Sequence, residues 1–450
     1  MKKNILELIK ERRVYFDGGT GTVLQKRGLV KGKAPEAWNI ENPQEIVALH
    51  KAYLEAGADI VKSNTFGVNS LKYSNYEELI EKALMCAKEA SLDYPESYIA
   101  FDMGPLGKLL KPWGDLDFLE AVEVFKKNAI LAKKYGADLI LIETMNDAYE
   151  TKAALLAAKE VSDLPVFVTN VYDEGRRLMT GADSKVMVSI LEGLGADAIG
   201  MNCSQGPDKM LPVVQEFNKI SSLPIIVNPN AGLPFMKDGE TMYSFDSEVF
   251  STHGIDIAKS GGAVMGGCCG TNPEYIKLLK EKTDNIPASI INEKDITLAS
   301  TYSKAVDFSE TVILGEMLDI EKSESFKDAL ADGDYDYAVD AALDMSDEDA
   351  SVITLNMDGY DDKLSDVVFE IQSVSNISML LKSKDIKSLE KAARIYNGKP
   401  LIYVYKEMKE EILAVAKKYG AVIVTEDKES ALNFGIKAKD IVSFDSFELI

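Results

Sequence analysis

Short apolar segments recur through the first 270 residues, each followed by a turn rich in Gly, Asn or Asp and then by a helix-like segment. Runs this short and apolar, separated by helices, are typical of a parallel sheet buried on both faces. Eight such units predict an α/β fold, a closed (β/α)8 TIM barrel. The predicted strands lie near Val14–Phe16, Asp59–Ser63, Tyr98–Phe101, Asp138–Ile142, Val166–Thr169, Ala198–Gly200, Ile225–Val227 and Ala263–Met265.

A short repeat supports this strand count. The tripeptide Gly-Ala-Asp occurs at 57–59, 136–138 and 195–197, each time between a predicted helix and the next strand. Gly is the usual residue just past a helix C-terminus, because it adopts the left-handed conformation at little cost. These sites precede strands two, four and six, and Gly261-Gly262-Ala263 occupies the matching place before strand eight.

The pattern changes from about Ile286, where acidic, linker-like segments appear. This region holds five or six strand–helix units, too few for a normal barrel. We therefore expect two domains, a barrel over residues 1–288 and a smaller, incomplete βα domain over 289–450. Strands are predicted at Thr311–Leu314, Val352–Leu355, Ile377–Leu381, Leu401–Val404 and Val422–Thr425, with helices at Ile386–Tyr396 and Glu407–Tyr419.

Composition and charge narrow the class of protein. No apolar run approaches the roughly 20 residues that span a bilayer, and residues 1–13 lack a signal-peptide core, so we expect a cytoplasmic protein without membrane contact. The net charge of −23 argues against nucleic acid as a partner. Residues 307–365 hold 18 acidic and 3 basic side chains. That stretch is either a solubilising surface or a docking face for a basic partner.

Polar and Gly-rich motifs follow each predicted barrel strand, where barrel enzymes build their active sites. Two of these motifs contain cysteine: Cys203 follows strand six, and Cys268 and Cys269 follow strand eight. Alternate strands contribute to the same layer of a barrel, so the three sulfurs can meet above its mouth. Three thiolates with one open position are the ligand pattern of a catalytic zinc site. Core packing, a redox pair and iron–sulfur ligation are the alternatives.

The remaining candidate residues concern the substrate. A thiol that fills the open position of such a zinc site is deprotonated and remains a nucleophile. Asp17 and Glu143 end strands one and four and could hold an ammonium group, while Gly18 and Gly19 expose N–H groups that suit a carboxylate. Together these groups describe a thiol amino acid. Cys86, His50 and His253 lie in predicted helices and are expected to be ordinary structural residues.

The motifs resemble the homocysteine S-methyltransferase family over residues 10–285, and most closely the N-terminal homocysteine module of cobalamin-dependent methionine synthase. The resemblance implies an S-methyltransferase that uses homocysteine as methyl acceptor and gives methionine, with no catalytic residue beyond the zinc-activated thiolate. It implies zinc ligands at Cys203, Cys268 and Cys269, ammonium contacts at Asp17 and Glu143, and Asn230 near the open position. The motifs are DGGTGT at 17–22, NTFG at 64–67, DMGPLG at 102–107, NCSQGP at 202–207, NPNAG at 228–232 and GGCCGT at 266–271.

The second domain resembles a shortened, diverged methyltetrahydrofolate-binding barrel. Ile313–Glu316 matches the opening of that module and Asn356 lies near a pterin-contacting position, but Thr354 replaces an expected Asp, so folate binding is not expected. The chain has no cobalamin signature D-x-H-x-x-G. Two methyl donors remain open: a methylcorrinoid (methylcobalamin) on a separate protein that docks on the acidic second domain, or a small onium compound of the S-methylmethionine or betaine type. A zinc-binding scaffold without catalysis is the non-enzymatic alternative.

Overall fold

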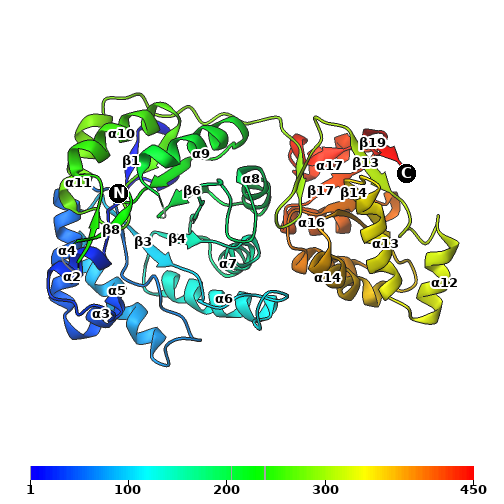
Figure 1. Cartoon of the computed structure of the whole chain (residues 1–450), viewed down its shortest axis with the longest axis horizontal. Coiled ribbons are helices and arrows are strands. Elements are labelled where there is room, and N and C mark those ends of the chain that lie inside the picture. Colours follow the sequence, from blue (N-terminus) through cyan, green and yellow to red (C-terminus); the bar gives the residue numbers. More distant parts are fainter. Residues whose placement is uncertain (1, 204, 238–239) are drawn as a thin grey trace. The chain divides into compact units, whose positions relative to one another are not determined.

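The computed structural model describes residues 2–203, 205–237 and 240–450. The chain divides into two compact units. The first unit comprises residues 1–179 and 196–293, and the second comprises residues 180–195 and 294–450. Each unit is built around its own parallel sheet (Figure 1).

Eight parallel strands of the first unit form a closed barrel. Their order in the sheet is β1-β10-β7-β6-β5-β4-β3-β2, and a parallel bridge between Phe16 and Ile60 joins its two ends. All eight predicted strands and the predicted barrel are thereby confirmed. The strands are β1 (Val14–Tyr15), β2 (Ile60–Lys62), β3 (Tyr98–Met103), β4 (Leu139–Met145), β5 (Val166–Asn170), β6 (Ala198–Asn202), β7 (Ile225–Asn228) and β10 (Gly262–Met265).

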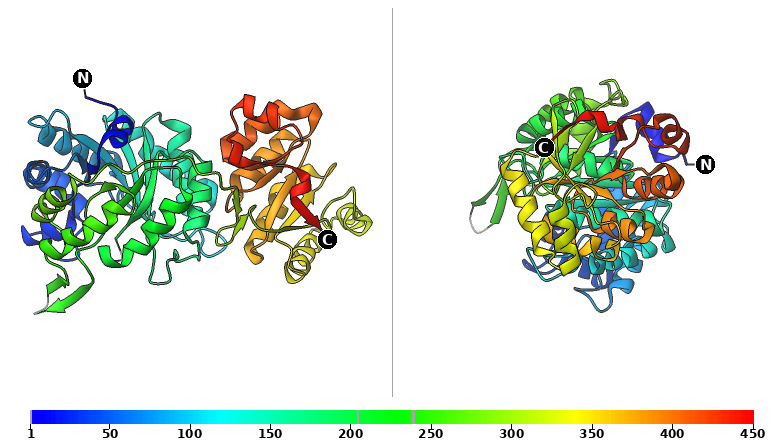
Figure 2. Two further views of the ribbon diagram at one scale, coloured as in Figure 1. Left: turned by 90° about the horizontal axis from the view of Figure 1, so that it is seen from above. Right: turned by 90° about the vertical axis from the view of Figure 1, so that its right-hand side faces the viewer.

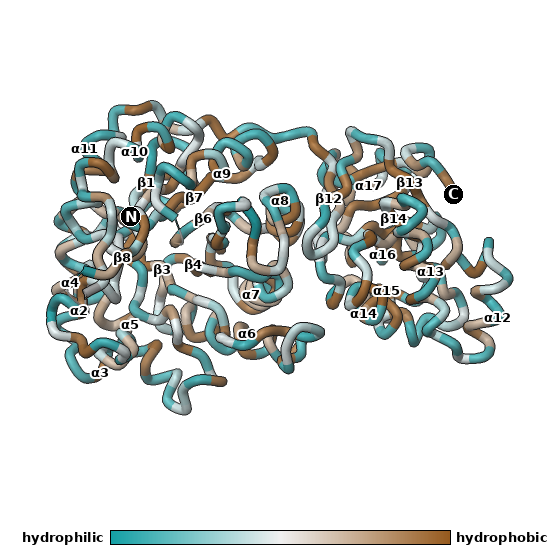
Figure 3. Tube along the Cα trace, viewed as in Figure 1, coloured by the Kyte–Doolittle hydropathy of each residue, from teal (hydrophilic) through white to brown (hydrophobic). Residues whose placement is uncertain are grey.

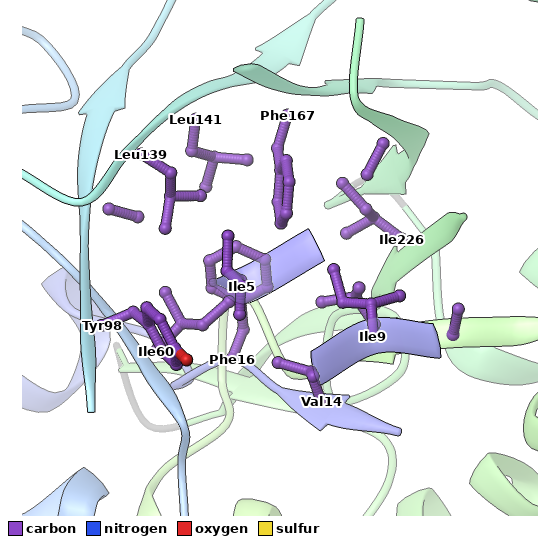
Figure 4. Packing of buried hydrophobic residues seen from close by; sticks show 14 residues of the cluster. Ile5, Ile9, Val14, Phe16, Ile60, Tyr98, Leu139, Leu141, Phe167 and Ile226 are labelled. Atoms are coloured by element: carbon purple, nitrogen blue, oxygen red, sulfur yellow. The ribbon is translucent and has the colours of Figure 1, made fainter. Parts of the chain in front are cut away.

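The floor of the barrel is packed with apolar side chains that converge from most of its strands. The short helix α1 (Ile5–Glu11) contributes Ile5 and Ile9 to the same cluster. Packing is close enough that a Cβ at Gly200 would lie 1.9 Å from the carbonyl oxygen of Ile226. The barrel is therefore filled below, and its polar residues lie at the opposite, C-terminal end. Figure 4 shows the converging side chains of Phe16, Leu139, Leu141, Phe167 and Ile226.

Helices follow most of the strands and surround the barrel. Several begin at an Asp or Asn whose side chain accepts a hydrogen bond from a free N–H of the first turn; Asp147 before α7 is one example. Cys86 lies buried in α5, as predicted. The helices of the first unit are α2 (Gly21–Lys26), α3 (Trp38–Glu41), α4 (Pro43–Glu55), α5 (Tyr76–Ser91), α6 (Phe118–Lys134), α7 (Ala148–Val161), α9 (Pro207–Ile220), α10 (Ser247–Lys259) and α11 (Pro273–Thr283).

An antiparallel hairpin interrupts the connection between β7 and α10. It consists of β8 (Pro234–Lys237) and β9 (Glu240–Tyr243), and the sequence pattern did not predict it. The side chains of β8 are all exposed, and the hairpin projects away from the barrel (Figure 2). The last residue of the hairpin, Tyr243, lies beside Gly270 of the second cysteine motif, as described below.

The second unit contains a seven-stranded parallel sheet of order β18-β17-β16-β15-β14-β13-β19. Phe447 of β19 is the fifth residue after Val442 of β18, so their Cα atoms lie at most roughly 18 Å apart. A flat sheet of seven strands would place its edges roughly 29 Å apart. The sheet must therefore curl toward a barrel. Its strands are β13 (Val312–Gly315), β14 (Val352–Asn356), β15 (Ser378–Lys382), β16 (Leu401–Tyr403), β17 (Val422–Val424), β18 (Ile441–Val442) and β19 (Phe447–Leu449).

The acidic stretch is structured rather than linker-like. Its middle forms two helices, α12 (Glu324–Asp332) and α13 (Asp336–Asp347), each with one apolar face. Along the tube of Figure 3, hydrophilic and hydrophobic stretches alternate in the helices, as expected for one buried face. The other elements of this unit are the hairpin β11 (Leu298–Ser300) and β12 (Ala305–Asp307), and the helices α8 (Ser184–Gly193), α14 (Leu364–Val374), α15 (Ile386–Ile395), α16 (Lys409–Tyr419) and α17 (Lys428–Phe434).

Within the described part of the chain, no helix combines the length and the apolar character that crossing a bilayer requires.

Candidate metal centre and acceptor site

Three cysteines meet at the C-terminal mouth of the barrel. Cys203 follows β6, Cys268 and Cys269 follow β10, and their three Sγ atoms all lie within 4.8 Å of one another. Sulfurs bound to one tetrahedral zinc ion at about 2.3 Å would lie roughly 3.8 Å apart. The three cysteines are intermediate in burial as whole residues, and none of them forms a disulfide bond. The structure thus brings together the three residues that the sequence motifs single out.

The loop after β7 holds both cysteine segments through the backbone. Cys203 N–H donates to the carbonyl of Asn228 at 3.1 Å, and Cys268 N–H donates to that of Pro229 at 2.7 Å. Cys269 N–H donates to Asn230 Oδ1 at 3.1 Å. The NPNAG motif therefore serves as the common support of the three sulfurs. Asn230 is buried beside them, and Ser204 of the NCSQGP motif lies outside the described residues.

Local backbone strain accompanies this arrangement. Cys203 has a φ of 60°, in the left-handed region that a side chain rarely adopts. Gly270, directly after the cysteine pair, has a φ of 82°, and a Cβ there would lie 2.4 Å from the ring of Tyr243. Strained residues of this kind cluster at functional sites.

The protonation chemistry of the thiols fits a metal site. Contact with Cys203 and burial raise the pKa of the Cys268 thiol, and Cys268 raises the pKa of Cys269 to about 12 although Cys203 opposes it. Three thiolates this close repel one another, which disfavours the charged forms of Cys268 and Cys269. A soft divalent ion reverses that preference, since thiolates are its ligands. Three cysteine ligands with one open position suit a zinc ion.

A second cluster, of carboxylates, lies in the same barrel mouth. Asp17, Asp102 and Glu143 come from the ends of β1, β3 and β4 and are all at least 94% buried. Burial raises the pKa of Asp17 to about 7, with Lys62 opposing it, and burial followed by Glu143 raises that of Asp102. Asp17 Oδ1, Asp102 Oδ1 and Glu143 Oε2 have no hydrogen-bond partner. The cluster therefore presents three oxygens that accept no hydrogen bond, and two of them, on Asp17 and Glu143, form ion pairs with Lys62.

Lys62 is the site residue that the sequence reasoning missed. It ends β2, and its Nζ lies 3.5 Å from Glu143 Oε2 and 3.8 Å from Asp17 Oδ1. Burial alone would lower the pKa of Lys62, but Glu143 and Asp17 outweigh burial and raise it. Its position near the end of the predicted strand Asp59–Ser63 was the available signal, since the other candidate residues had been selected at polar strand ends.

The glycines after Asp17 have a packing role in this structure. A Cβ at Gly18 would lie 2.6 Å from Thr271 Oγ1, and one at Gly19 would lie 2.8 Å from the carbonyl oxygen of Cys268. Gly19 N–H donates to Thr271 Oγ1 at 3.0 Å. The first loop thus packs tightly on the cysteine loop, and one of the two N–H groups predicted for a substrate carboxylate already has a partner.

A pocket of about 310 Å³ opens beside the cysteine loop, between α2 and the β8–β9 hairpin. Tyr243 and Gly270 form its wall on the cysteine side, and Lys26 and Lys31 line its other side. Burial, followed by Cys269, raises the pKa of the Tyr243 hydroxyl. Tyr243 therefore lies beside the cysteine pair, between it and the pocket.

Both histidines lie in helices, as predicted. His50 lies in α4, its two ring nitrogens are buried without partners, and burial lowers its pKa to about 4. His253 lies in α10 and stacks on Phe245, with 5.4 Å between the ring centroids. Neither belongs to the group of described residues able to hold a metal ion.

Comparison with known proteins agrees with this site. The sequence profile of the homocysteine S-methyltransferase family matches residues 14–283. Methionine synthase of Mycobacterium leprae is 27% identical over 435 residues, which cover 89% of this chain and 36% of that protein. Methionine synthase of Mycobacterium tuberculosis is 28% identical over 383 residues, covering 79% and 32%. The chain thus spans about a third of the length of these relatives.

Solved structures support the fold. The homocysteine methyltransferase MmuM from Escherichia coli, in its metallated form, is similar with a TM-score of 0.53 and 21% sequence identity. The similarity covers 61% of this chain and 98% of that one. The oxidized form of the same protein gives a TM-score of 0.54. Since the profile covers more than half of the sequence, the chain belongs to the homocysteine S-methyltransferase family.

Proposed function

We propose that this protein transfers a methyl group to the thiol of homocysteine, giving methionine, with zinc held by Cys203, Cys268 and Cys269. The observation that carries the proposal is the pairing of two clusters in one barrel mouth. Three sulfurs lie within 4.8 Å of one another, and three buried carboxylate oxygens that accept no hydrogen bond lie at the ends of other barrel strands. A thiol amino acid could bind the cysteine cluster through its thiol and the carboxylate cluster through its ammonium group.

The cysteine cluster would supply the thiolate chemistry. Zinc with three thiolate ligands keeps one position open and binds a substrate thiol as a nucleophilic thiolate at neutral pH. The protein's own contribution is the support of the three sulfurs by the loop after β7, described above.

The carboxylate cluster would orient the amino-acid end. An ammonium group has three N–H donors, and the cluster offers three oxygens that accept no hydrogen bond, on Asp17, Asp102 and Glu143. Buried acceptors without partners are costly, so a ligand that satisfies them gains the corresponding free energy. This supports the predicted roles of Asp17 and Glu143 and adds Asp102. Gly18, Gly19 and Asn230 remain proposed contacts of the same ligand.

A methylcorrinoid on a separate protein is the donor we propose. The family profile ends at residue 283, whereas the similarity to the Mycobacterium leprae methionine synthase covers 89% of the chain. That similarity must therefore include much of the second unit, which supports a methionine synthase relationship over both proposed domains, 1–288 and 289–450. We propose that the second is a diverged, truncated pterin-binding-like domain whose acidic surface docks the donor protein.

A donor panel tests the proposal. The zinc-loaded protein is incubated with homocysteine and, in turn, methylcobalamin, S-methylmethionine, betaine and methyltetrahydrofolate, and methionine is measured. Methionine formed with methylcobalamin supports the corrinoid donor. Methionine formed only with S-methylmethionine or betaine would contradict it and identify an onium compound as the donor. Calorimetric titration with homocysteine separates an enzyme from a scaffold, because a scaffold would bind no thiol at the metal.

A further inference from the structure

Lys62 is a buried cation in the middle of the acceptor site, and the proposed chemistry gives it no role. Its side chain is 5% exposed, and its Nζ lies between Glu143 and Asp17 at 3.5 and 3.8 Å. Within the part of the chain that the structure describes, no hydrogen bond has Lys62 Nζ as its donor. The ammonium group thus balances the charge of these two acids in ion pairs, and its N–H groups can still donate to a ligand placed beside it.

An α-amino acid is a zwitterion, so a site for it needs anions and a cation side by side. The three carboxylates alone would attract the ammonium group but would repel the carboxylate on the same carbon. The backbone offers limited help, since Gly19 N–H is already bonded to Thr271. Lys62 is the group placed among the acids that can accept a carboxylate as partner.

We propose that Lys62 binds the carboxylate of the acceptor and makes the site specific for a zwitterionic thiol. The inference rests on the proposed function and names the head group that the site selects. The acids take the ammonium group, Lys62 takes the carboxylate, and the thiol extends toward the cysteines. A charge-assisted hydrogen bond of this kind is worth about 10- to 100-fold in affinity.

Three thiols of equal chain length test this assignment by calorimetric titration of the zinc-loaded protein. Homocysteine carries both charges, 3-aminopropane-1-thiol lacks the carboxylate, and 4-mercaptobutyrate lacks the ammonium group. Wild-type protein should bind homocysteine about 10- to 100-fold more tightly than 3-aminopropane-1-thiol. Equal affinity for these two ligands would overturn the proposal without any variant.

Variants of Lys62 add the second comparison. Lys62→Met should weaken homocysteine binding by about 10- to 100-fold and leave the affinity for 3-aminopropane-1-thiol unchanged or higher, whereas Lys62→Arg should recover part of the loss. Lys133→Met, on the exposed face of α6, is the matched control. If Lys62→Met weakens both ligands equally, Lys62 only balances the acids and the proposal is wrong.

The same comparison with S-methylated ligands separates this inference from the proposed function. L-Methionine, 3-(methylthio)propylamine and 4-(methylthio)butyrate carry the three head groups without a thiol. If the thiols fail to bind at the metal but the affinity for L-methionine still depends on Lys62, the proposed function is wrong and the role of Lys62 is supported. If the thiols bind at the metal but Lys62→Met changes the affinity for neither homocysteine nor L-methionine, the role of Lys62 is wrong and the proposed function is unaffected.

Discussion

Asn202 and Thr144 are joined by two hydrogen bonds of opposite direction. Thr144 N–H donates to Asn202 Oδ1 at 2.9 Å, and Asn202 Nδ2 donates to Thr144 Oγ1 at 2.7 Å. Thr144 follows Glu143 and has a φ of 62°, and Asn202 precedes the equally left-handed Cys203. Asn202 Nδ2 also lies 3.9 Å from Cys268 Sγ. This pair therefore couples the carboxylate cluster to the proposed metal centre.

Asn202→Ala should weaken zinc binding by about 10- to 100-fold, because groups that orient metal ligands typically contribute that much. It should also weaken homocysteine binding, since Thr144 loses the partner that fixes the end of β4. Competition with a chelator measures the zinc affinity, and Asn75→Ala, on an exposed turn, is the control. Unchanged zinc affinity in Asn202→Ala would contradict this coupling.

Glu143→Gln should weaken homocysteine binding by about 10- to 100-fold and leave the zinc content unchanged, because it removes one charged acceptor of the proposed ammonium contact. Calorimetric titration gives the affinity, and metal analysis gives the zinc content. Glu120→Gln, on the exposed side of α6, is the matched control. Loss of zinc from Glu143→Gln would show that Glu143 supports the metal site instead.

His50 predicts a pH dependence of stability. Its pKa is about 4 in the folded protein, below the ordinary 6.5, so the fold favours the neutral ring. As the pH falls from 6.5 toward 4, His50 becomes protonated in the unfolded chain but stays largely neutral in the folded chain. The free energy of unfolding therefore falls by about 3 kcal/mol. In His50→Leu this part of the loss should be absent. Denaturant unfolding of both proteins between pH 7.5 and 5 measures it, and parallel pH profiles would contradict the assignment.

The second unit contains a buried ion pair whose loss should be costly. Lys382 Nζ lies 2.7 Å from Asp319 Oδ2, and Asn356 Nδ2 donates to Asp319 Oδ1 at 2.6 Å. Lys382→Met leaves the Asp319 charge buried and should destabilise this unit by about 3 to 5 kcal/mol. Zinc binding in the first unit should persist. Adding Asp319→Asn should restore part of the free energy of unfolding. If it restores none, the unpaired Asp319 charge is not the cause of the destabilisation.

The barrel and its cysteine site followed from sequence because their signals are local. Each strand is a short apolar run that ends in a polar motif, and Cys203, Cys268 and Cys269 lie directly at such ends. The sequence did not single out Lys62, because a lysine that follows a short apolar run such as Ile60-Val61 usually indicates a solvated strand end. Its burial depends on Asp17 and Glu143, which are distant in sequence.

The elements that sequence did not predict depend on tertiary contacts. Strands β18 and β19 have two and three residues, too few for any periodicity, and exist because they pair with β17 and β13. The β8–β9 hairpin has exposed apolar side chains that resemble neither a buried nor a half-buried strand. Helices α12 and α13 were not predicted, because their many acidic residues resemble a linker. In the structure these residues cover the solvent face while a few apolar side chains pack inward.

X-ray absorption spectroscopy of the zinc-loaded protein, with and without homocysteine, tests the central claim most directly. The zinc ion should have three sulfur neighbours at about 2.3 Å and one lighter ligand, and homocysteine should replace the lighter ligand with a fourth sulfur. Cys269→Ala should lose the zinc site while the barrel remains folded. Fewer than three sulfur neighbours, or a sulfur count that homocysteine leaves unchanged, would contradict the proposed centre.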